Sequence, residues 1–130
     1  MIVLAPMLDA AIALANLEAP RAQDLLSRAS RYEAIAGPWL PYLRGLAAMG
    51  VKDYAAAAAQ FRQVIARRGI QPASMVRPVS RLQLARALRA AGDASGARQA
   101  YVEFQASWRG ADPRQPLRIA AEEETAALQR

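Results

Sequence analysis

The 130-residue chain contains no cysteine and no histidine. Without cysteine it can have no disulfide, no thiolate metal ligand and no thiol nucleophile. Without histidine it lacks the most common general base near neutral pH and the most common metal ligand. The acidic residues are scattered, apart from the run Glu122, Glu123 and Glu124, so a site built from paired carboxylates is not favoured. We therefore expect no catalytic site, no metal site and no cofactor.

Long apolar runs are also missing from the sequence. No stretch approaches the roughly 18–20 apolar residues that a membrane-spanning helix needs. The opening residues 1–6 place no positive charge ahead of their apolar side chains, unlike a signal peptide. We therefore expect no membrane insertion and a cytoplasmic location for the isolated chain. The alternative location is the extracytoplasmic side of a membrane-anchored parent protein.

Lysine occurs only at Lys52, and the other basic residues are arginines in a chain of net charge +6. Such a charge permits contact with nucleic acid, with acidic peptides or with anionic lipid. The basic residues are spread along the chain, however, and only Arg67 and Arg68 are adjacent. A solvated basic surface is therefore the simplest interpretation of the charge.

Alanine is the most frequent residue, and no segment shows the alternation of apolar and polar residues that indicates a strand. Alanine favours helices because it loses no side-chain entropy in them. The sequence therefore predicts an all-α fold in a single domain over residues 1–130. The expected helices span residues 4–17, 20–34, 38–50, 53–68, 74–91, 93–108 and 114–129.

An internal repeat gives this prediction more detail. Shifting the chain by 35 residues places Pro6 on Pro41, and a small residue follows four positions after each proline. In three places a small residue is followed twelve positions later by alanine, and four positions after that by a large apolar residue. These three sets are Ala10, Ala22 and Leu26; Gly45, Ala57 and Phe61; and Ala85, Ala97 and Tyr101.

The spacing resembles that of the tetratricopeptide repeat, in which each unit is a pair of antiparallel helices. The two small residues are expected where the helices of a pair cross, and the large residue in the wedge between neighbouring pairs. The resemblance implies an α-solenoid of three helix pairs, at about 4–34, 38–68 and 74–108. A capping helix at about 114–129 would cover the end of the third pair.

Several segments point to one group of such arrays. They lie at residues 42–47, 57–65, 68–70, 84–87, 97–101 and 108–113. In these segments the chain resembles the tetratricopeptide arrays in the C-terminal part of bacterial serine/threonine protein kinases and of related winged-helix regulators. The resemblance implies a sensory or scaffolding module of a signalling protein. The kinase motifs themselves are absent, so no kinase activity or catalytic residue is implied.

Stacked repeats of this kind bind other proteins on an extended surface, which the first helix of each pair lines. The residues expected there occupy matching positions in the second and third copies: Tyr42, Leu46, Met49, Leu82, Arg86 and Arg89. This surface is apolar with arginine at one end, and the repeat skeleton does not bury those charges. It suits a protein or peptide partner with apolar residues and an acidic residue. The competing interpretation is that these side chains pack against neighbouring helices.

Two alternatives to a protein-binding module remain. The chain could be a structural scaffold that forms homo-oligomers through the ends of its stack. A nucleic-acid-binding helical domain is less favoured, because the only candidate recognition helix is the one at 74–91, with Arg77, Arg81 and Arg89. A steep loss of affinity with salt would mark that mode of binding.

Overall fold

The computed structural model describes residues 13–14, 16–29, 39–66, 76–107 and 115–128. These residues form six helices and no strand, which confirms the predicted all-α fold for this part of the chain. The helices are α2 (Ala19–Ala29), α4 (Trp39–Gly50), α5 (Tyr54–Ala66), α6 (Val76–Ala90), α7 (Ala94–Ser107) and α8 (Pro116–Leu128). Helices α4 to α8 begin and end within two residues of the predicted bounds. Of the helix predicted at 4–17, only residues 13–14 and 16–17 are described, and 13–14 are helical; Ala10 of the repeat lies outside the described residues.

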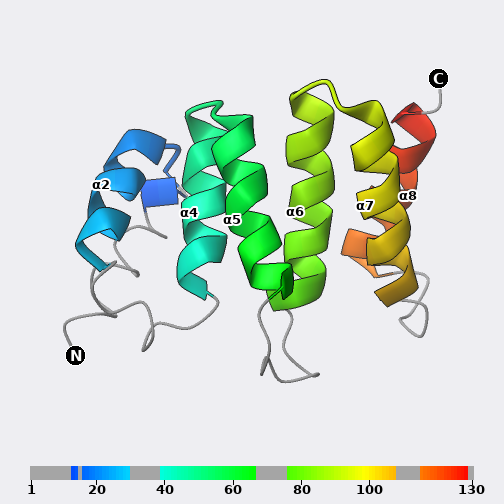
Figure 1. Ribbon diagram of the computed structural model, residues 1–130, viewed down its shortest axis with the longest axis horizontal. Coiled ribbons are helices and arrows are strands. Elements are labelled where there is room, and N and C mark those ends of the chain that lie inside the picture. The colour runs from blue at the N-terminus through cyan, green and yellow to red at the C-terminus, as the bar shows by residue number, and fades with distance from the viewer. Residues whose placement is uncertain (1–12, 15, 30–38, 67–75, 108–114, 129–130) are drawn as a thin grey trace.

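The described helices stand in an elongated row, with α2 at one end and α8 at the other (Figure 1). From α4 to α8 each helix packs against the next along the chain, and α2 packs against α4. Helix α4 also contacts α6, its next neighbour but one. Because these two helices touch, α4 and α6 share one side of the row.

Three turns between successive helices have the same backbone conformation. The left-handed region is occupied by Leu17, Lys52 and Gly92, with φ of 61°, 64° and 92°. In each turn the following amide donates to a carbonyl five residues back, which satisfies an acceptor at the end of the helix. These bonds run from Glu18 to Ala13, from Asp53 to Ala48 and from Asp93 to Leu88, with N–O distances of 2.7, 2.9 and 2.9 Å. The turns are 35 and 40 residues apart, which is also the spacing of the sequence repeat.

An acidic residue follows each left-handed position and precedes the next helix. The Asp53 carboxylate accepts a hydrogen bond from the Ala56 amide at 3.3 Å, and the Asp93 carboxylate accepts one from the Gly96 amide at 2.9 Å. Both aspartates therefore act as N-caps, which satisfy amides that have no partner inside the helix. Each turn thus ends one helix and starts the next within a few residues, and the two helices must lie side by side.

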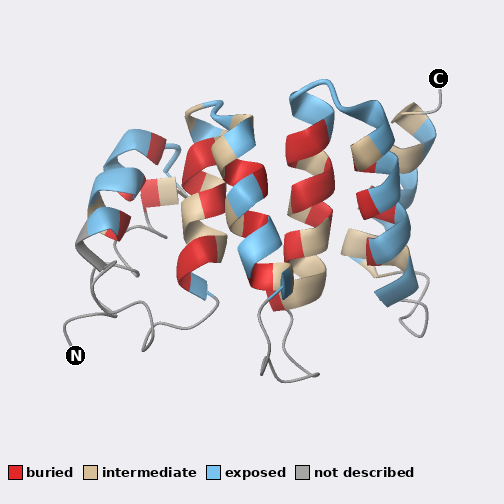
Figure 2. Ribbon diagram, in the orientation of Figure 1, coloured by how far each residue is buried: buried red, intermediate tan, exposed pale blue. Residues whose placement is uncertain are grey.

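The small residues of the repeat lie in the core, where adjacent helices meet. A Cβ atom added at Gly45 would lie 2.5 Å from the ring of Phe61 on α5. Atoms that are not bonded do not approach so closely, so α4 and α5 can meet here only because residue 45 is glycine. Figure 2 shows buried residues along α4, α5 and α6 and few on α8. The repeat residues that are buried are Ala22, Leu26, Gly45, Ala57, Phe61, Ala85, Ala97 and Tyr101.

Replacing Ala57 by leucine is expected to lower the free energy of unfolding by roughly 1–3 kcal/mol, because the buried site has no room for a larger side chain. Ala59 lies on the same helix but is exposed, and it provides the control. Ala59→Leu should change the free energy of unfolding by less than about 0.5 kcal/mol. Chemical denaturation measures both values. Equal stability of the two variants would show that Ala57 does not lie at a close helix contact.

Candidate protein-binding site

The structure leaves five of the six predicted groove residues at least partly accessible. Tyr42, Leu46 and Met49 on α4 are half-buried and pack against the main hydrophobic core. On α6, Arg86 is half-buried and Arg89 is exposed. Part of each of these side chains can therefore still contact a partner.

Leu82 is the exception, and its assignment to the groove was wrong. The residue is fully buried in the main core, so it has no surface to offer a partner. The repeat places Leu82 on α6 at the position of Tyr42 on α4. Matching positions fix the side of the helix on which a residue lies, but they do not fix how closely neighbouring helices cover it.

An exposed tryptophan extends the apolar part of this surface. Trp39, at the start of α4, is 44% exposed. Its ring meets the ring of Tyr42 edge-on, with centroids 5.6 Å apart, and Tyr42 in turn packs on the buried ring of Phe61 at 5.9 Å. Trp39 was not among the residues predicted for this surface. Its position three residues before Tyr42 was the available signal, because residues three apart lie on the same side of a helix.

Tyr42 also connects α4 with α6. Burial raises the pKa of its hydroxyl group, while a hydrogen bond with the Gln83 side chain and the nearby charge of Arg86 oppose that rise. Gln83 and Arg86 both belong to α6. Tyr42 therefore lies between the other apolar residues of α4 and the polar residues of α6. We call these residues together the α4–α6 face.

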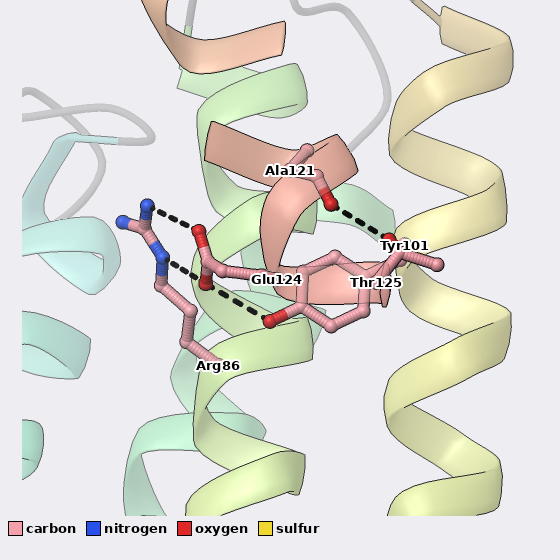
Figure 3. A network of polar contacts seen from close by, with 5 residues as sticks. All are labelled: Arg86, Tyr101, Ala121, Glu124 and Thr125. Atoms are coloured by element: carbon pink, nitrogen blue, oxygen red, sulfur yellow. Dashed lines mark hydrogen bonds and ion pairs between the residues drawn. The ribbon is translucent and has the colours of Figure 1, made fainter. Parts of the chain in front are cut away.

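The basic end of the α4–α6 face is occupied by the chain's own carboxylate. Arg86 Nε and Nη2 donate to Glu124 Oε1 and Oε2, both at 2.9 Å, in a bidentate ion pair between α6 and α8 (Figure 3). The hydroxyl of Tyr101 on α7 donates to Glu124 Oε1, also at 2.9 Å. We call these three residues and Arg89 the Glu124 network. The charge of Arg86 is therefore already paired within the chain, because α8 brings its own acid to this end of the surface.

The electrostatics of the Glu124 network favour the ionised carboxylate. Burial acts to raise the pKa of Glu124, but hydrogen bonds from Arg86 and Tyr101 and the positive charge of Arg89 lower it below its ordinary value. The hydrogen bond to Glu124 raises the pKa of the Arg86 guanidinium. Burial and the bond to Glu124 raise the pKa of Tyr101 to about 12. At neutral pH the tyrosine is thus a donor and the carboxylate an acceptor.

Helix α8 also contacts the row through other described residues. Ala121 is its one buried residue, and Leu117 and Leu128 pack partly against the main core. Thr125 accepts a long hydrogen bond of 3.4 Å from Gln105 on α7, and its hydroxyl donates to the Ala121 carbonyl within α8 (Figure 3). The Glu124 network therefore ties α8 to both α6 and α7.

A hollow of about 400 Å³ lies between α5, α6 and α7. The apolar residues Leu84 and Leu88 line it together with the charged Arg62 and Glu103. None of the predicted groove residues contributes to this hollow, so it is separate from the α4–α6 face.

Neither a metal site nor a membrane-spanning element is found in the described parts of the chain. No group of three or more acidic residues there is close enough to hold a metal ion. No described helix is both long enough and apolar enough to cross a membrane.

No protein-family model matches the chain, and no curated protein is similar enough to match it. Its function is therefore inferred from the residues and contacts described above.

The pH dependence of stability should reveal the Glu124 network. Because the pKa of Glu124 is lowered in the folded chain, its contribution is complete above the ordinary value of 4.5 and is lost as the pH falls through the lowered value. The free energy of unfolding of the parent should therefore fall more steeply below about pH 4.5 than that of a Glu124→Gln variant. Denaturation curves between about pH 7 and about pH 3 measure both slopes. Parallel curves for the two proteins would show that Glu124 gains nothing from Arg86 and Tyr101.

Proposed function

We propose that the chain is a protein-binding module of stacked tetratricopeptide-like helix pairs, and that its partner binds to the α4–α6 face. The observation behind this proposal is the strip formed on α4 by Trp39, Tyr42, Leu46 and Met49, which we call the α4 strip. Its members are half-buried or exposed although all are apolar or aromatic. Aromatic residues and methionine are enriched at protein interfaces. An exposed tryptophan supported by packed rings is a suitable anchor for a partner.

The repeated turns support the tetratricopeptide part of the proposal. Left-handed residues at positions 17, 52 and 92 recur with the 35- and 40-residue spacing of the small residues in the sequence. The small residues at 45, 57, 85 and 97 are buried. Both features fit close packing of consecutive helix pairs, and the α4–α6 contact fits the stacking of one first helix on the next.

The proposed biological role is sensory or scaffolding. It is supported by the resemblance of residues 38–130 to the arrays in bacterial serine/threonine protein kinases and winged-helix regulators. In that role the module would recognise a peptide or helix of another signalling protein. The chemistry of the α4 strip selects for aromatic or aliphatic anchors in that partner.

A homo-oligomeric scaffold is the second candidate. It is favoured by the exposed apolar residues Val102 on α7 and Ile119 on α8, at the end of the row opposite α2. A nucleic-acid-binding role has less support, because a recognition helix must enter a groove of the nucleic acid. Helix α6 lies between α5 and α7 (Figure 1), and its Arg77 and Arg81 are half-buried.

Peptides selected from a random library against the full chain are expected to contain aromatic or aliphatic anchors. Trp39→Ala and Met49→Ala should each weaken binding of a selected peptide about tenfold or more, because each truncates an anchor of the interface. Val102→Ala is the control, since Val102 is an exposed apolar residue outside the α4 strip. Fluorescence anisotropy of the labelled peptide measures the three affinities.

The opposite pattern of affinities would assign the interface to another part of the chain. If both strip variants bind normally and Val102→Ala does not, the partner surface lies at the α7–α8 end. Sedimentation at two concentrations tests the second candidate separately. The scaffold would be favoured if the mass of the parent chain rises with concentration and that of the double variant Val102→Ser, Ile119→Ser does not.

A further inference from the structure

Helix α8 has the two chemical properties expected of a ligand for the α4–α6 face. It has an acid, Glu124, which pairs with Arg86 through two hydrogen bonds of 2.9 Å and accepts a third from Tyr101. It also has apolar residues, of which Ala121 is buried and Leu117 and Leu128 pack partly against the core. The chain's own helix α8 thus has the chemistry predicted for a partner of the α4–α6 face.

The residues that receive Glu124 form a site specific for a carboxylate. The Arg86 guanidinium binds both carboxylate oxygens, a fork geometry that fixes the orientation of the acid as well as attracting its charge. The Arg86 and Glu124 side chains are only 31% and 22% exposed, and shielding from water strengthens such bonds. The third donor is the Tyr101 hydroxyl, held by a fully buried ring. Arg89 adds a second positive charge beside the carboxylate.

The apolar part of the α8 contact is small in comparison. Helix α8 has a single buried residue, Ala121, whereas α6 and α7 each have several. Its outward side is formed by exposed residues, among them Ile119, Glu122 and Glu123. The apolar residues Leu117, Ala120, Ala127 and Leu128 of α8 are only half-buried, so its polar contacts add to a modest apolar contact in keeping it docked. A competing helix with its own carboxylate can therefore replace it.

We infer that Arg86, Tyr101 and Arg89 form a carboxylate-recognition site for a helix, and that α8 closes this site until a helix of a partner protein displaces it. The pattern of α8 defines the ligand class. Leu117, Ala121, Glu124 and Leu128 are spaced four, three and four residues apart, which places them on one side of a helix. The partner helix therefore combines one acid with flanking apolar residues. This inference rests on the proposed function, because it identifies the partner of the α4–α6 face.

The test uses the full chain and a fluorescent peptide of residues 115–128 as the probe. In the parent chain the resident α8 competes with the peptide. Glu124→Ala in the chain removes the acid from the resident helix and leaves the receiving site intact. The peptide should then bind roughly tenfold to hundredfold more tightly than it binds the parent. Glu123→Ala is the matched control, because Glu123 lies on the same helix but is exposed, and it should bind the peptide as the parent does.

Two further binding measurements test whether the peptide uses the carboxylate site. A peptide with Glu124→Gln should lose most of the gained affinity for the Glu124→Ala chain. The double variant Glu124→Ala, Arg86→Lys of the chain should bind the unaltered peptide more weakly than Glu124→Ala alone. Lysine keeps the charge but cannot form the bidentate pair. Circular dichroism of each chain at the assay temperature establishes that it is folded.

Several results would overturn the inference. One is equal binding of the peptide to the parent, Glu123→Ala and Glu124→Ala chains. Another is binding that does not depend on the acid of the peptide. The inference would also be overturned if the parent chain forms dimers that do not bind the peptide, because α8 of a second copy would then be the ligand. The two proposals can fail separately, because Trp39→Ala is tested with the library-selected peptides and Arg86→Lys with the α8 peptide.

Discussion

The close approach of helices at small residues is the constraint on which the other features of this chain depend. At Gly45 the backbone of α4 lies so near the Phe61 ring that even a methyl group has no room. Ala57, Ala85 and Ala97 are buried in the same core. Side chains larger than these would separate the helices, and the large residues that follow would no longer fill the space between them.

The same packing positions the surface proposed for binding. Phe61, held against Gly45, supports the ring of Tyr42, and Tyr42 supports Trp39. Tyr101 occupies in the third repeat the position of Phe61 in the second, and its hydroxyl reaches Glu124 on α8. Both aromatic residues of the repeat therefore have a buried ring that supports a group on the surface. This explains how a core built for stacking can also define a binding site.

Much of the fold could be predicted from the sequence, because it depends on local signals. Gly92-Asp93 and the Asp53 cap indicate where helices end and begin, and the spacing of small residues indicates which sides of the helices meet. The site was less predictable. Leu82 had the correct position in the repeat, but its burial depends on the helices around it. The pairing of Arg86 with Glu124 joins residues 38 positions apart, and no local pattern marks such a contact.

The most direct test of the close helix approach is a double-mutant cycle between Gly45→Ala and Phe61→Leu, followed by chemical denaturation. Alanine is a better helix former than glycine by about 1 kcal/mol. If the backbone of α4 lies against the Phe61 ring, Gly45→Ala should nevertheless destabilise the parent, and it should cost clearly less beside the smaller leucine. If Gly45→Ala instead stabilises the parent by about 1 kcal/mol and the two substitutions are additive, the helices do not meet at Gly45.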